Sequence, residues 1–102
     1  MPQTEKIIIH PDEEVLHLLP RFLENLRKEL AAVVQAVERQ DWDRVRGIGH
    51  ILKGSGSSFG CDEVTRLGAL LEEAGRACRT DLALSLEQEL TDYVSRVEVA
   101  PR

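Results

Sequence analysis

The sequence predicts an all-α domain, an antiparallel up-down four-helix bundle with a short extra helix at its N-terminal side. Apolar residues recur at steps of three and four in four segments, and connections as short as "RQD" and "RTD" separate them. The 102 residues suffice for one core but not for two. With one Trp, one Tyr and two Phe, the core must be mostly aliphatic, a composition that favours helices over strands.

The N-terminal residues divide into a tail and a short helix. Residues 1–11 form the predicted tail, in which Ile7-Ile8-Ile9 is expected to pack along the bundle in an extended form. Pro11 and Asp12 are helix-start signals, and acidic residues follow them. We therefore expect a short helix over about 12–19 that ends or kinks at Pro20.

Two long helices follow, and each has one apolar stripe. The first runs from Pro20 to about Arg39 with its stripe at Leu23, Leu26, Leu30, Val33, Val34 and Val37. Asp41 is the candidate N-cap of the second helix. That helix is expected to end near Gly60, and its stripe consists of Val45, Ile48, Leu52 and Phe59.

Two further helices complete the predicted bundle, which spans residues 12–97 and leaves 98–102 as a C-terminal tail. One starts at Cys61 or Asp62, and its inner face carries Val64, Leu67, Leu71, Ala74 and Cys78. The last has Thr80 or Asp81 as its cap and buries Leu82, Leu86, Leu90, Tyr93 and Val97.

Charge and composition exclude several classes of function. A net charge of −5 gives the chain no overall attraction for nucleic acid or anionic membrane. Cys61 and Cys78 form no zinc pattern, so both are expected as free thiols in the core. No apolar run is long enough for a bilayer, and no signal peptide follows Met1. We expect a free-standing cytoplasmic protein.

The stretch "RVRGIGHILKGSGSSFG" holds four helical glycines around His50, at a cost of roughly 1 kcal/mol each. At about 100° per residue, His50 lies opposite the apolar stripe and should face solvent. Gly47 and Gly54 share its face, so a partner surface can approach the imidazole closely. Gly49 and Gly56 lie on a lateral stripe, where a neighbouring helix can pack near the backbone.

The residues that share this face suit an anionic group. Lys53 follows His50 by one turn, and its charge favours the neutral, nucleophilic imidazole. Arg46 adds positive charge on this face, Arg44 belongs to the same basic cluster in the sequence, and Ser57 can donate to a phosphate oxygen. An idle surface histidine on a solvated helix face is the alternative. The chain has no P-loop and no Mg²⁺ carboxylate cluster, so phosphate and metal would come from a partner.

The motif His50-Ile51-Leu52-Lys53-Gly54-Ser55, followed by Gly60, resembles the histidine-containing phosphotransfer (HPt) domain family of two-component phosphorelays. "LPRFLENLRKEL", "QDWDRV" and "LGALLEEA" resemble the family's neighbouring helices, and the likeness covers residues 12–97. The chain departs from the family at positions 47 and 49, where relatives more often have alanine or larger residues.

The resemblance implies that His50 takes a phosphoryl group from a receiver-domain aspartate and hands it to another receiver. Lys53 would steady the phosphoryl oxygens, and Gly54 would give room for docking. The implied partners are receiver domains of a hybrid sensor kinase or a response regulator. They would supply the acidic pocket and Mg²⁺ to a monomeric phosphoryl carrier that has no cofactor, metal or ATP site of its own.

Two other functions are open. One is a helical docking scaffold that binds a receiver or a kinase without phosphotransfer; the intact His50 and Lys53 argue against it. The other is a helical metal or cofactor protein that uses His10, His17, His50 and the cysteines. His50 lacks a ligand partner four residues away and lies outside the bundle, which argues against this second function.

Overall fold

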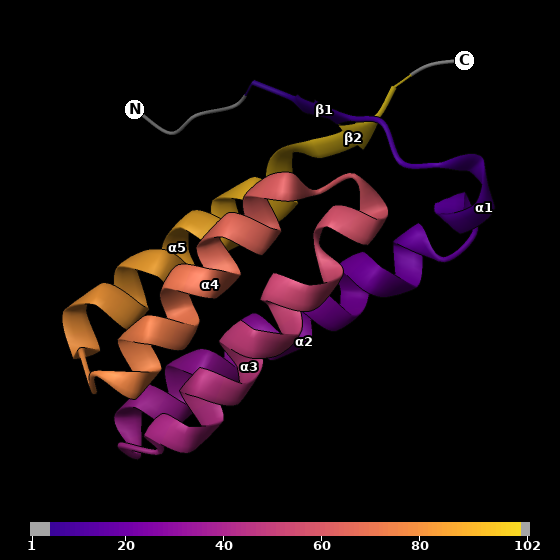
Figure 1. The fold of residues 1–102 in the computed structure, drawn as a ribbon. Helices are drawn as coiled ribbons and strands as arrows, with labels where there is room; N and C mark the ends of the chain where they lie inside the picture. The colour runs from indigo at the N-terminus through magenta and orange to yellow at the C-terminus, as the bar shows by residue number, and fades with distance from the viewer. Residues whose placement is uncertain (1–4, 101–102) are drawn as a thin grey trace.

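The computed structural model describes residues 5–100, which form a helical bundle with a small pair of strands (Figure 1). The elements in chain order are β1 (Ile7–Ile9), α1 (Glu13–Leu16), α2 (Leu19–Glu38), α3 (Trp42–Ser55), the 3-10 helix η1 (Ser57–Phe59), α4 (Asp62–Arg76), α5 (Thr80–Arg96) and β2 (Val97–Val99). The outer parts of both predicted tails, 1–4 and 101–102, lie outside the described residues.

Each long helix sends its apolar stripe into one shared core. The most deeply buried members include Leu26, Leu30 and Val33 of α2, Val45, Ile48 and Leu52 of α3, Val64, Leu67 and Leu71 of α4, and Leu86, Leu90 and Tyr93 of α5. The predicted stripes are thereby confirmed, although Leu23, Val34 and Leu82 are only partly buried. No helix among residues 5–100 has the length and apolar character to cross a membrane.

The connections after α2 and α4 have the same left-handed geometry. Gln40 and Cys78 have φ of 57° and 55°. The next amide in each case donates to a carbonyl five residues back, from Asp41 to Ala36 at 2.8 Å and from Arg79 to Ala74 at 3.0 Å. This is the Schellman arrangement that ends helices. It turns Cys78 outward, so the prediction of a buried Cys78 was wrong, while Cys61 is buried as expected.

Several helix ends differ from the prediction by a few residues. Helix α1 stops at Leu16, and Pro20 lies in the first turn of α2, where its missing N–H costs no hydrogen bond. Asp41 caps α3 as predicted, since its carboxylate accepts from the Arg44 amide at 3.2 Å.

At the far end of α3 the prediction was too long. The α-helix stops at Ser55 and continues as η1, after which Gly60 takes φ of 74°. Phe59 therefore lies on η1, where its ring stacks on Phe22 with centroids 4.2 Å apart. The caps proposed for α5 were also misplaced, because Arg79 occupies the N-cap position.

The N-terminal isoleucines are extended, as predicted, and they pair with the other end of the chain. Strands β1 and β2 run parallel, with Ile7 opposite Val97 and Ile9 opposite Val99. Val97 is thus a strand residue, not the last buried position of α5. The two strands cross one end of the bundle (Figure 1).

Candidate functional site

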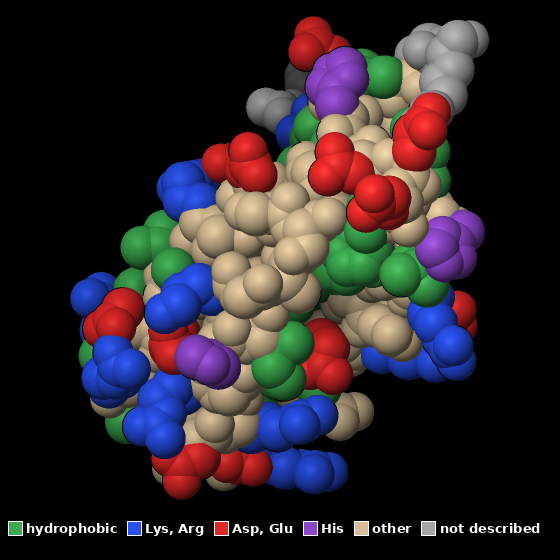
Figure 2. All heavy atoms as spheres, turned by 45° about the vertical axis from the view of Figure 1, so that its right-hand side comes forward, with side chains coloured by type: hydrophobic (Ala, Val, Ile, Leu, Met, Phe, Trp, Pro, Cys, Tyr) green, Lys and Arg blue, Asp and Glu red, His purple; other side chains and the backbone are tan. Residues whose placement is uncertain are grey.

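His50 projects from the exposed face of α3, as the helical spacing predicted. Its side chain is 69% exposed. Val45, Ile48 and Leu52 fill the core on the other side of the same helix. Figure 2 shows that most of the visible Lys and Arg side chains lie over the lower half of one face of the molecule, while Asp and Glu side chains lie both among them and toward the opposite end.

Glycine backbones bring α3 and α4 unusually close together. A Cβ on Gly49 would collide with the Glu72 amide nitrogen, and a Cβ on Gly68 would lie 2.6 Å from the Lys53 nitrogen. Gly75 and Gly56 make equally close approaches, to Arg46 and to Thr65. No side chain fits at these four positions without moving the backbone. The contact places Glu72 of α4 next to the exposed face of α3.

The Glu72 carboxylate contacts both His50 and Lys53. Its Oε2 lies 2.9 Å from Nδ1 of His50, and its Oε1 accepts a hydrogen bond from Nζ of Lys53 at 3.0 Å. The Glu72 side chain is only 11% exposed, whereas Lys53 is 46% exposed. A largely buried carboxylate of α4 thus bridges the two predicted site residues of α3.

This arrangement determines which imidazole nitrogen is free. The hydrogen bond from the Lys53 ammonium lowers the pKa of Glu72, and the His50 contact adds to that effect against the opposing influence of burial. An ionised carboxylate only accepts hydrogen bonds, so Nδ1 of His50 must carry the proton that points to Oε2. In the neutral ring the lone pair then lies on Nε2, away from Glu72.

Gly47 and Gly54 leave open space beside His50. A Cβ built on either residue meets nothing within 4 Å, in contrast to Gly49 and Gly56. The two glycine pairs therefore have the two different environments that the helical spacing predicted. The role of Gly47 and Gly54 in docking stays a prediction.

The other two predicted binding residues, Arg46 and Ser57, have different surroundings. Arg46 is exposed one turn before His50, on the same helix. Ser57 lies beyond the end of α3, and both its amide and its hydroxyl donate to Oγ1 of Thr65, at 2.8 and 3.1 Å. The Ser57 hydroxyl therefore holds the α3–α4 connection in this structure.

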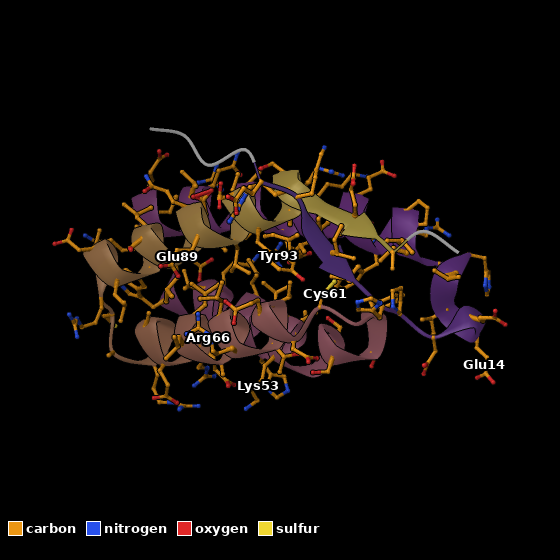
Figure 3. All side chains as sticks on the ribbon, turned by 90° about the horizontal axis from the view of Figure 1, so that it is seen from above. Glu14, Lys53, Cys61, Arg66, Glu89 and Tyr93 are labelled. Atoms are coloured by element: carbon orange, nitrogen blue, oxygen red, sulfur yellow. The ribbon has the colours of Figure 1, made fainter. Side chains whose placement is uncertain are left out.

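Lys53 points away from the strands at the outer edge of the helices (Figure 3). The helical spacing predicts that its ammonium can reach an anion attached to the imidazole ring. In the structure the ammonium pairs with Glu72 instead. Lys53 is half exposed, so its ammonium is accessible from solvent. Contact between this ammonium and a phosphoryl oxygen stays a prediction.

The chemistry of the donor set beside His50 does not fit a metal. Both Glu72 oxygens already face donors, and no group of three or more His, Cys, Asp or Glu within residues 5–100 is arranged to hold an ion. Elsewhere, burial raises the pKa of the Cys61 thiol and of the Tyr93 hydroxyl. Both groups are therefore neutral and unreactive near pH 7.

Sequence reasoning missed Glu72, Gly68 and Gly75. They lie at steps of four and three on one face of α4, and the glycines are seven residues apart, as Gly49 and Gly56 are on α3. Matching glycine pairs on successive helices are the signal that could have found this contact. A glutamate between them, on a buried stripe, was the corresponding signal for a functional carboxylate.

The chain matches the model of a known protein family. The family model described as "Hpt domain" matches residues 17–100, which include α2 to α5 and the His50 site. No curated protein and no solved structure matches the chain.

Proposed function

Since the chain belongs to the Hpt domain family, we propose that it is a phosphoryl carrier in which His50 accepts a phosphoryl group from a receiver-domain aspartate and passes it to another receiver domain. Membership implies a role in histidine phosphotransfer within two-component phosphorelays, in which Hpt domains interact with receivers. We also propose that the four long helices form an antiparallel up-down bundle. The protein is proposed to be a monomer, because the His50 face must stay accessible to the partner. It is also proposed to work in the cytoplasm.

The observation that carries the proposal is the hydrogen bond between His50 and Glu72. With the proton on Nδ1, Nε2 attacks the phosphorus atom of an aspartyl phosphate. A nitrogen–phosphorus bond forms, the phosphorus–oxygen bond to aspartate breaks, and the carboxylate leaves with the bonding electrons. The reverse reaction with a second receiver restores the free imidazole.

Glu72 stabilises the product of this step. Attack by Nε2 while Nδ1 keeps its proton leaves a positive charge on the ring. The carboxylate 2.9 Å from Nδ1 is already in place to balance that charge. Lys53 keeps Glu72 ionised and holds its second oxygen in place. We further propose that Lys53, together with Arg46, attracts the phosphoryl oxygens while the partner is bound.

Mg²⁺ belongs to the partner in this proposal. The carboxylate beside His50 is engaged with two donors and does not fit a Mg²⁺ ligand set. The receiver's acidic pocket would hold the ion, and no step here depends on its position.

The first test needs no partner. The protein is treated with a small phosphoramidate donor at neutral pH, and the modified residue is mapped under alkaline conditions. We expect acid-labile phosphorylation at His50 that His50→Gln abolishes and His17→Gln, which alters another exposed histidine, leaves intact. Transfer from the phosphorylated protein to receiver domains completes the test. Slow labelling scattered over His10, His17 and His50 would contradict the proposal and favour the docking scaffold.

A further inference from the structure

A groove with a volume of about 550 Å³ lies between α4 and α5, and Ile7 of β1 is also part of its lining. This volume is within the usual range of binding sites. The apolar part of the lining comes from Ile7, Leu67 and the ring of Tyr93, and the rest is polar or charged. The phosphotransfer proposed for His50 uses none of these residues.

The groove opens on a different side of α4 from the His50 site. At about 100° per residue, Glu63 and Arg66, which line the groove, lie roughly 180° and 120° from Glu72 around the axis of α4. In Figure 3, Arg66 and Glu89 lie on the facing sides of α4 and α5. A partner bound in this groove would therefore leave His50 accessible.

Both arginines of the groove are already neutralised by carboxylates of its own lining. Arg66 donates two hydrogen bonds to Glu63, at 2.8 and 2.9 Å. Arg96, whose side chain is only 18% exposed, contacts Oδ2 of Asp92 through Nε at 3.0 Å and through Nη2 at 2.9 Å. The two ion pairs together add no net charge, so the groove does not attract an anion.

A third carboxylate of the lining, that of Glu89, has no such partner. Glu89 is exposed and forms no hydrogen bond and no ion pair within residues 5–100. The hydrogen bond to Glu63, and less strongly the charge of Glu89, raise the pKa of Arg66, so Glu89 lies near the other charges of the groove. The groove therefore combines an apolar floor with one carboxylate that is free to pair with a cation.

We propose that the α4–α5 groove is a docking site for a basic segment of a partner polypeptide, which lays the aliphatic stem of a Lys or Arg side chain on the apolar floor and pairs its charge with Glu89. Lys and Arg fit because a long apolar stem precedes the charge in both side chains. Helix α5 carries four acidic residues and one arginine, so it also attracts a segment that has several positive charges. The inference does not depend on the proposed phosphotransfer function.

The test uses an acetylated and amidated peptide, Lys-Ala-Lys-Leu-Lys, which is titrated into the labelled full-length protein. Amide chemical shifts should change most over α5 from Ser85 to Arg96 and over α4 near Glu63. Glu89→Gln should raise the Kd of the peptide about fivefold, because the free carboxylate is lost. Glu87→Gln is the matched control, since Glu87 lies on another face of α5, where it accepts from Thr91, and this variant should change Kd by less than about twofold.

Arg66→Gln tests the same site in the opposite direction. It removes a positive charge from the groove and frees Glu63, so the peptide should bind more tightly than it binds to wild type. Added salt should weaken binding to wild type and reduce its difference from Glu89→Gln.

Three results would overturn the docking site. The first is an equal Kd for wild type, Glu89→Gln and Glu87→Gln. The second is binding of butylguanidinium as tight as that of the peptide, which would assign the groove to a small organic cation. The third is slower labelling of His50 by a small phosphoramidate donor when the peptide is bound, because that would place the peptide over His50. Failure of His50 labelling without the peptide would contradict the proposed function alone.

Discussion

Glu72 contacts a different partner with each of its carboxylate oxygens, His50 through Oε2 and Lys53 through Oε1. The same carboxylate thereby sets the position of the ring proton and neutralises a cation one helical turn away. Its burial makes both contacts stronger than exposed ones would be, because solvent screens them less. At the scale of single residues, the position of the His50 ring proton depends on a side chain 22 positions further along the chain.

Removal of the carboxylate should release the imidazole proton. In Glu72→Ala we expect the two neutral tautomers of His50 to mix, whereas wild type holds the proton on Nδ1. The rate of phosphorylation by a small donor should fall about tenfold, because the charge that develops on the ring loses its counter-ion. Nitrogen-15 NMR of the ring and intact mass measure the two effects.

Glu73→Ala is the matched control for this comparison. Glu73 is the next residue of α4, but it is exposed and pairs with Arg76. Its loss should alter neither the tautomer nor the rate. A wild-type tautomer in Glu72→Ala would show that the hydrogen bond does not orient the ring.

Stability should depend on pH through Glu72. Its pKa is lowered in the folded protein from an ordinary value of 4.5, first of all by the Lys53 hydrogen bond. The ionised carboxylate therefore favours the folded state above about pH 4.5, and this contribution is lost as pH falls through the lowered folded pKa. In urea denaturation, the free energy of unfolding of wild type relative to Glu72→Gln should increase as pH rises from below the lowered folded pKa toward about 4.5, and the difference should stay constant at higher pH.

The cause of this pH dependence can be tested separately with Lys53. Glu72→Gln is introduced a second time, now into a protein that already carries Lys53→Met. The pH-dependent effect of Glu72→Gln on stability should be smaller there than in the wild-type background, since the largest cause of the pKa shift is gone. An effect of unchanged size would assign the shift to another group.

At the scale of elements, the central feature is the contact between α3 and α4. Helices pack at distances set by the side chains between them, and glycine permits the closest approach. Gly49 and Gly68 face the opposing backbone at Glu72 and Lys53. The contact therefore holds the three site residues in register, since any displacement of α4 along α3 would separate Glu72 from His50.

Gly47 and Gly49 offer a comparison within one helix. Gly47→Ala should stabilise the protein by about 0.5–1 kcal/mol, because alanine favours the helix and a Cβ meets nothing within 4 Å. Gly49→Ala should destabilise it by about 1–3 kcal/mol, because the added methyl collides with the α4 backbone. Thermal and urea denaturation measure both. A loss of stability in Gly47→Ala would mean that the exposed glycine has a backbone role.

At the scale of the whole molecule, β1 and β2 join the two ends of the described chain. Besides the strand pairing, the Ala100 amide donates to the Ile9 carbonyl at 3.0 Å. Ile9 is buried in the main core with 4% exposure, while Ile8 is 46% exposed. The strands thus cover the end of the bundle that carries the connection between α3 and α4. Gly60 of this connection lies close to the segment after β1, since a Cβ on Gly60 would lie 3.0 Å from the Pro11 nitrogen.

Ile9 and Ile8 test this closure as a matched pair. Ile9→Ala should lower the free energy of unfolding by about 2–4 kcal/mol, the usual cost of truncating a buried isoleucine. Ile8→Ala should change it by less than about 0.5 kcal/mol, as surface substitutions usually do. Urea denaturation of the two variants beside wild type measures both values. Similar losses in both variants would contradict the burial of one side of β1.

The sequence by itself determined the helical fold and the candidate histidine. Both depend on local periodicity: apolar residues at steps of three and four specify which face of each helix is buried, and His50 lies opposite that face on α3. The same arithmetic separated Gly47 and Gly54 from Gly49 and Gly56. Asp41 was predictable as a cap because capping involves residues three positions apart.

Only the tertiary structure decided which residues from separate elements meet. Glu72, the α4–α5 groove with Glu89, and the pairing of β1 with β2 all join positions far apart in sequence. Periodicity gives the face on which a residue lies but not the rotation or height of the neighbouring helix. Cys78 shows the same limit, since its helical spacing predicted burial, but the left-handed turn after α4 exposes it. Packing therefore decides which nitrogen of the His50 ring is free, because the hydrogen-bond partner of the other nitrogen lies on another helix.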